Sequence, residues 1–118
     1  MAKLYGTKKQ AKEACKREGE FAITYAEKAV AYAEQGFVTK AWSCADTAKM
    51  AADCAMKAHD ELWELSKGNL TDAEFDAFEK AEIAQAKART AINAAAKAGE
   101  KAQAEFDAQR KTKKVVRV

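Results

Sequence analysis

A row of alanines at seven-residue spacing constrains the fold of this chain more than any other feature. Read in alternating steps of four and three, the row comprises Ala77, Ala81, Ala84, Ala88, Ala91, Ala95, Ala98 and Ala102. This spacing places all the methyl groups on one stripe of a helix, where they allow a second helix to approach closely and favour a left-handed supercoil. No side chain on the stripe can act as an acid, a base, a nucleophile or a ligand. The stripe therefore predicts architecture and carries no catalytic chemistry.

The rest of the sequence is also typical of long helices. The chain has 118 residues, of which 33% are charged, with five glycines and no proline. Such a composition suits one helical domain with a modest core. Cap residues and glycines divide the chain into expected helices at about 8–35, 40–67 and 72–110. The clearest start is the capping box of Thr71 and Glu74, whose side chains can each satisfy a free backbone amide of the other.

Short turns at 36–38 and 68–70 make consecutive helices antiparallel neighbours. The sequence therefore predicts an all-α fold, an antiparallel bundle of three long helices with alanine-rich, close-packed seams. Gly19 and Gly99 lie inside the first and third helices, and a break at either would give four or five helices. We expect one bundle domain at 1–110 and a basic flexible tail at 111–118. The main core is expected from the large side chains where helices two and three meet, together with two N-terminal residues: Leu62, Trp63, Leu65, Leu70, Phe75, Phe78, Leu4 and Tyr5.

The third helix is expected to be longer than the other two. At 1.5 Å per residue it would be ~58 Å long, against ~43 Å for each of the others. If it does not break at Gly99 and fold back, its last turns have no partner inside one chain. This predicts a binding surface for another protein or for a second copy, made of Ala102, Gln103, Phe106 and Arg110.

Charge is distributed unevenly along the chain. The net charge is +3, but the segment 110–118 carries five basic residues and no acid, which leaves the remaining body at −2. Two basic sets are candidates for electrostatic contact: Lys111, Lys113, Lys114 and Arg117 in the tail, and Lys8, Lys9, Lys12 and Lys16 at the start of helix one. In a three-helix bundle the second set lies beside the acidic first turns of helix three. An alternative role for both sets is association with nucleic acid, expected to be weak and not sequence-specific because the tail has no aromatic residue to stack on bases.

The residues that usually carry chemistry do not form a recognisable constellation. Cys15, Cys44 and Cys54 form no CxxC pair, and they are expected to be small reduced core residues. The single histidine, His59, lacks the Glu-x-x-His context of a helical metal site and is expected to be a partly exposed surface residue. The sequence has no membrane-length apolar run and no secretory leader. We therefore expect a soluble, cytoplasmic protein that is not an enzyme and that needs no metal or cofactor.

These observations favour a non-catalytic protein–protein interaction module that presents a helical surface. A small, motif-free helical chain rich in alanine, lysine and glutamate resembles, in style, inhibitors and accessory proteins encoded by phages or mobile elements, of which anti-CRISPR proteins are one sort. The competing hypothesis is a nucleic-acid-associated protein that uses the basic tail and the N-terminal lysine face.

Overall fold

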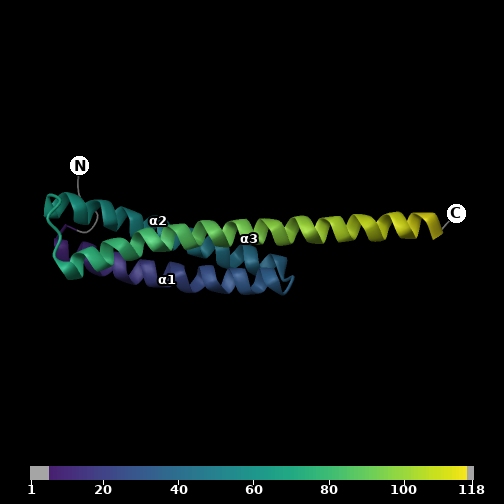
Figure 1. The fold of residues 1–118 in the computed structure, drawn as a ribbon, viewed down its shortest axis with the longest axis horizontal. Coiled ribbons are helices and arrows are strands. Elements are labelled where there is room, and N and C mark those ends of the chain that lie inside the picture. Colours follow the sequence, from purple (N-terminus) through teal and green to yellow (C-terminus); the bar gives the residue numbers. More distant parts are fainter. Residues whose placement is uncertain (1–5, 117–118) are drawn as a thin grey trace.

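Three helices make up almost all of the described chain (Figure 1). The structure is a computed structural model that describes residues 6–116, with side chains described as far as Arg110. Helix α1 spans Lys8–Glu34, α2 spans Val38–Ser66 and α3 spans Asp72–Val116, and each packs against the other two. Over residues 6–116 there is no strand. The predicted all-α, antiparallel three-helix bundle is confirmed.

Local hydrogen bonds explain where the helices begin. The Thr7 hydroxyl accepts the backbone N–H of Gln10 at 3.2 Å and caps α1. At the start of α3, the Thr71 N–H donates to the Glu74 carboxylate at 2.9 Å while the Glu74 N–H donates to the Thr71 hydroxyl at 3.2 Å. The predicted capping box is therefore present, and it fixes the entry into the longest helix.

The turn between α1 and α2 is tighter than the sequence predicted. Gly36 has a φ of +83°, and its N–H donates to the Ala33 carbonyl while the Phe37 N–H donates to the Tyr32 carbonyl. This pair of bonds satisfies the end of α1 in the manner of a Schellman motif, and α2 then starts at once at Val38. The expected start at about residue 40 was therefore two residues late, and Thr39 already lies in the first turn of α2.

Neither internal glycine breaks its helix. Gly19 lies inside α1, and a Cβ placed there would come within 3.0 Å of Lys80 Cγ and 3.4 Å of the Lys80 carbonyl oxygen. The glycine therefore serves a close approach of α1 to α3. Gly99 lies inside α3 against Val38 and Trp42, and α3 continues past it to Val116. The bundle consequently has three helices and not four or five.

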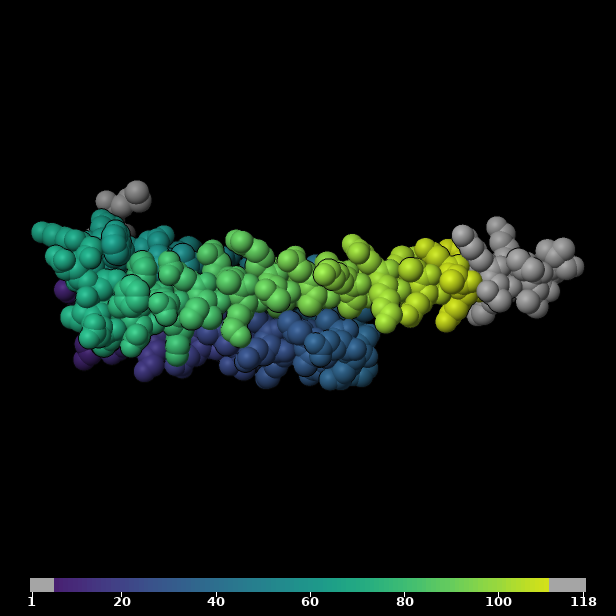
Figure 2. Space-filling view, viewed as in Figure 1, coloured from purple at the N-terminus to yellow at the C-terminus, as the bar shows by residue number. Residues whose placement is uncertain are grey.

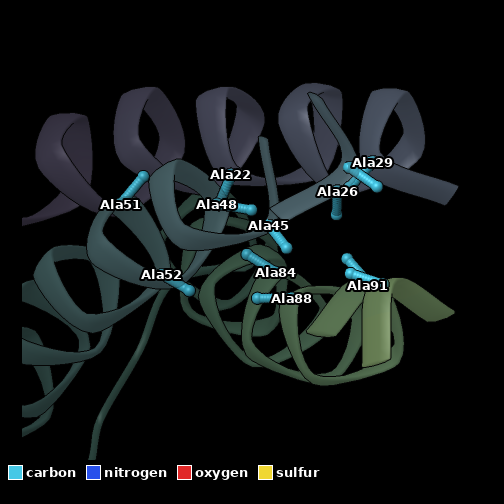
Figure 3. Packing of buried hydrophobic residues seen from close by; sticks show 12 residues of the cluster. Ala22, Ala26, Ala29, Ala45, Ala48, Ala51, Ala52, Ala84, Ala88 and Ala91 are labelled. Atoms are coloured by element: carbon cyan, nitrogen blue, oxygen red, sulfur yellow. The ribbon is translucent and has the colours of Figure 1, made fainter. Parts of the chain in front are cut away.

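The interior of the bundle is made almost entirely of alanine methyl groups. Figure 3 shows alanines from all three helices pointing toward one another. Apart from Cys15 and Leu62, every buried apolar residue of the described chain is alanine. The alanine row of α3 is buried from Ala77 to Ala95 and half-buried at Ala98. It is exposed at Ala102, close to the turn that joins α1 to α2. The seam predicted from the heptad spacing is confirmed over the length of the bundle.

The expected core of large side chains was correct only in part: Leu65, Leu70 and Phe78 pack half-buried against a cluster that contains Leu62, but Trp63 and Phe75 do not belong to it. Of these side chains only Leu62 is fully buried, whereas Trp63 is 51% exposed and Phe75 is 50% exposed. Helices separated only by methyl groups leave no interior space for indole or phenyl rings, so the rings lie along the outer edge of the seam. Leu4 and Tyr5, also expected in this core, lie outside the described residues.

The molecule is a rod, 71 Å long and 27 by 17 Å across. Helix α3 has 45 residues, against 27 in α1 and 29 in α2, and it projects past the α1–α2 turn (Figures 1 and 2). The helix runs six residues beyond the expected end at Arg110. The sequence predicted a flexible tail at 111–118. The side chains of these residues, and all of 117–118, lie outside the described part of the structure.

Candidate functional site at the projecting end of α3

Helix α3 leaves its two partners next to the α1–α2 turn. Ala98, Lys101, Ala102 and Glu105 of α3 line a shallow cavity of about 190 Å³ together with the last residues of α1 and the turn, 33–36. Gly99, the residue after Ala98, lies against Val38 and Trp42 at the start of α2. Every described side chain from 101 to 110 is exposed. We call residues 101–116 the projecting end of α3.

The predicted partner-binding residues all lie on this projecting end. Phe106 is 54% exposed, and the guanidinium carbon of Arg110 lies 5.9 Å from its ring centroid. The Gln103 side-chain amide donates to the Asp107 carboxylate at 3.1 Å. Phe106 follows Gly99 by two helical turns, so it lies on the side of α3 that faces α2 further down the rod. The side of α3 that packs against the other helices is therefore exposed to solvent on the projecting end, and Ala102 and Phe106 lie on that side.

The N-terminal lysines lie at the end of the rod where α1 and α3 begin, whereas α3 carries residues 111–116 to the opposite end. Lys12 and Lys16 line a cavity of about 200 Å³ between α1 and α3, together with Asp76 and Lys80. The backbone hydrogen bond from Thr71 lowers the pKa of Glu74, with smaller contributions from the charges of Lys8 and Lys12. The N-terminal lysines therefore lie beside the acidic start of α3, as expected. Lys9 is exposed on the same turn of α1, whereas the side chains of Lys111, Lys113, Lys114 and Arg117 lie outside the described residues.

His59 is not the partly exposed surface residue that the sequence suggested. It is buried, with Nδ1 at 2.9 Å from Asp60 Oδ1 and Nε2 at 3.2 Å from Glu82 Oε2. Its ring stacks on Phe78 with centroids 3.6 Å apart. Glu82 and Phe78 both come from α3, which no reading of α2 by itself can reveal. Pairing residues at equal distances from the 68–70 turn would have placed 59 opposite the region of 79, and this signal was available.

The stacked histidine belongs to a larger group of rings, which we call the aromatic patch: His59, Trp63, Phe75 and Phe78. The Phe78 ring centroid lies 5.6 Å from that of Trp63 and 6.5 Å from that of Phe75. Because Trp63 and Phe75 are half exposed, the patch forms part of the surface where α2 ends and α3 begins. The sequence analysis assigned Trp63, Phe75 and Phe78 to the core and His59 to the surface, and so it did not identify this patch.

The structure offers little to a catalytic mechanism at these positions. Both ring nitrogens of His59 face carboxylates and one ring face is covered by Phe78, so the imidazole presents no unoccupied nitrogen to a ligand. Burial, reinforced by the charge of Asp60, raises the pKa of the Cys15 thiol to about 11, which suppresses its thiolate. Cys54 is exposed, contrary to the expectation for all three cysteines. Among residues 6–110, no group of three or more histidine, cysteine or carboxylate side chains is placed to hold a metal ion.

Comparison of the chain with protein-family models, with curated proteins and with solved structures gave no match. None of the described helices contains a stretch long and apolar enough to cross a bilayer. The functional assignment therefore rests on the geometry of the projecting end and of the surfaces described above.

Proposed function

We propose that this chain is a non-catalytic protein–protein interaction module that docks on its partner through the projecting end of α3. The observation that carries the proposal is the length of α3, which continues from the α1–α2 turn to Val116 with Phe106 half exposed on a bundle-facing side. The contact residues are Ala102, Gln103, Phe106 and Arg110.

The energetics of an unsupported helix favour this proposal. Isolated helices shorter than about 12–15 residues are marginal in water, and most helix stability in proteins comes from packing of one face. On the described part of the projecting end, the stabilising contacts include local pairs four residues apart, Gln103 with Asp107 and Phe106 with Arg110. Phe106 is 54% exposed, so burial of the rest of its side chain by a partner would contribute about 0.8–1.6 kcal/mol. A second protein surface would thus supply the packing that α1 and α2 supply elsewhere.

The setting of this interaction is also part of the proposal. Cys15, Cys44 and Cys54 are all unpaired, which suits a reducing compartment such as the cytoplasm. A chain of this size, without a catalytic constellation among its described residues, would act by occupying a surface of its partner. We therefore retain the proposal of a small inhibitor or accessory protein of the kind encoded by phages and mobile elements.

Affinity capture from a lysate of the source organism tests the proposal. Immobilised wild-type protein is compared with Phe106→Ser and with a matched control, Phe21→Ser, which removes a phenylalanine that is 46% exposed on the bundle body. We expect Phe106→Ser to lose the captured partner and Phe21→Ser to keep it. Thermal unfolding of each variant verifies that the bundle is intact. Capture of the same partner at the same level by all three proteins would refute the assigned surface.

Association with nucleic acid is not favoured by the geometry. A single basic face would concentrate cations along one nucleic-acid backbone. Here the N-terminal lysines lie at the end of the rod where α1 and α3 begin, next to carboxylates, while α3 carries residues 111–116 to the opposite end (Figure 1). The N-terminal lysines and residues 111–116 therefore do not combine into one surface.

A further inference from the structure

The aromatic patch is an exposed apolar surface surrounded by carboxylates. Asp60 and Glu82 flank His59, and their side chains are 78% and 54% exposed. Asp72 and Glu79 lie one helical turn before and after Phe75, which makes them its neighbours on the surface of α3. The cation nearest to Trp63 along the chain is Lys67, four residues later at the C-cap of α2. The half-exposed rings of Trp63 and Phe75 are therefore set in a predominantly negative surface.

Four other aromatic rings of the described chain, Tyr25, Tyr32, Phe37 and Phe106, have a lysine or arginine close to the ring. The Lys28 ammonium lies 4.9 Å from the Tyr25 ring centroid, and Lys40 lies 5.6 Å from that of Tyr32 and 5.4 Å from that of Phe37. Phe106 is paired with Arg110 in the same way. Within residues 6–110, no lysine or arginine is placed over Trp63, Phe75 or Phe78. Because ring faces attract cations, the aromatic patch is suited to a partner that brings cations with it.

The chain itself carries a segment of that chemistry at the end of α3. Residues 110–118 contain five basic residues, no acid and three valines. This combination provides cations for the carboxylates and ring faces together with aliphatic side chains for the apolar part of the aromatic patch. The charge of the segment, +5, is opposite in sign to that of the four carboxylates around the patch.

The basic segment cannot reach the aromatic patch of its own chain. Phe75 lies in the first turn of α3, and 41 residues of continuous helix separate it from Val116. At 1.5 Å per residue this places the two about 60 Å apart, because α3 runs along most of the length of the rod (Figure 1). Only another molecule can bring such a segment to the patch.

We propose that the projecting end of α3 in one copy docks on the aromatic patch of a second copy, so that copies associate head to tail. This inference rests on the proposed role of the projecting end as a docking element, and it identifies the partner as the chain itself. Each contact joins two different surfaces, so every pair retains one unused aromatic patch and one unused projecting end. Such an interface adds further copies and forms open chains, unless the rotation closes a ring.

Three variants test this arrangement in the full-length protein. The end variant, Lys113→Glu with Lys114→Glu, reverses two charges of the basic segment. The patch variant, Phe75→Ser with Glu79→Lys, removes a half-exposed ring and reverses a neighbouring charge. The matched control, Met50→Ser with Asp46→Lys, makes the same kind of change four residues apart on α2, where Met50 is 70% exposed.

Sedimentation velocity over a range of concentrations measures the association. We expect the wild type and the control to grow in mass with concentration, and to dissociate between about 50 mM and about 500 mM NaCl. The end variant and the patch variant should each associate at least about tenfold more weakly than the wild type. An equimolar mixture of these two variants should form a heterodimer and stop there, because the end variant keeps its aromatic patch and the patch variant keeps its basic segment. A symmetric dimer through any other surface does not give this pattern.

Three results would overturn the inference: a wild type that stays monomeric at every concentration, an end or patch variant that assembles like the wild type, or a mixture without a heterodimer. If the patch variant fails to fold by circular dichroism, Glu79→Lys alone replaces it, since that change alters only an exposed side chain. A monomeric wild type that still captures a different protein through Phe106 removes head-to-tail association and leaves the proposed function standing. A wild type that neither associates with itself nor captures a different protein through Phe106 removes both head-to-tail association and the proposed function.

Discussion

Enlarging one methyl group in the seam tests the architecture most directly, and Ala91→Leu is the sharpest such change. Ala91 is fully buried on α3 within a cluster of alanines from all three helices. Leucine adds an isopropyl group to that methyl, and the atoms that surround it are short side chains and backbone, which cannot rotate away. Overpacking of this kind costs about 1–3 kcal/mol. We expect a value near the upper end, because the helices must separate to admit the larger group.

The assay is thermal and urea unfolding of Ala91→Leu beside Ala86→Leu, which makes the same change at an exposed position of the same helix. For a chain of this size, a loss of about 2 kcal/mol lowers the unfolding temperature by roughly 10 °C. The Ala86 variant should stay within about 0.5 kcal/mol of the wild type. Equal effects of the two substitutions would mean that the seam is loose or solvated, and the close-packed architecture would have to be abandoned.

Further substitutions and solution measurements test other parts of the structure. Gly99→Ala should raise the free energy of unfolding by about 0.5–1 kcal/mol, because the added Cβ meets only ordinary contacts. Gly19→Ala should raise it less, because the added Cβ would meet Lys80 at 3.0 Å. Equal gains of the two variants in urea unfolding would contradict the close approach of α1 to α3. Because folding lowers the pKa of Glu74 from 4.5, Glu74→Gln should be less stable than the wild type by about 0.5–1 kcal/mol at pH 7. That difference should vanish as the pH falls through the folded-state pKa, and a constant difference in urea titrations at pH 7 and pH 3 would rule this out. At pH 8 a thiol reagent should modify the exposed Cys54 readily and Cys15 only after denaturant is added; rapid modification of Cys15 in the folded protein would show that its burial is wrong. Duplex DNA titrated by fluorescence anisotropy at low and moderate salt should show at most weak binding; tight binding that falls steeply with salt would favour the nucleic-acid hypothesis instead.

The features that the sequence predicted correctly are those set by local or periodic rules. The alanine row of α3 predicted the seam because seven-residue spacing fixes one helix face whatever the partner is. The capping box at Thr71 was predictable for the same reason, since both of its hydrogen bonds join residues three apart. Continuity through Gly99 was left open, because its helix-propensity penalty of about 1 kcal/mol is comparable with the stabilisation from neighbouring residues, and only the contacts with Val38 and Trp42 decide it.

The features that it missed depend on distances between helices. Trp63 and Phe75 were assigned to the core because they are large and apolar, which is a good rule where helices are separated by large side chains. In this bundle the methyl seam sets a shorter separation, and that separation excludes the rings from the interior. The burial of His59 follows from the same cause: the close approach of α2 and α3 brings Glu82 and Phe78 onto the imidazole, which directly follows the buried Ala58 in α2. The alanine stripe thus already implied that the rings lie outside.

A methyl seam also determines where such a protein can carry function. Each buried methyl contributes only about 0.8 kcal/mol, so stability must accumulate along the length of the helices and not across a wide core. The result is a rod whose long sides repeat the same seam and whose ends differ: one carries the aromatic patch, and the other carries the projecting end of α3. Recognition that depends on distinctive chemistry is therefore expected at the ends. A variant with two more heptads inserted into all three helices would lengthen the rod and leave both ends unchanged. If that variant lost its binding, recognition would have to lie along the sides, and the reasoning from the seam to the ends would fail.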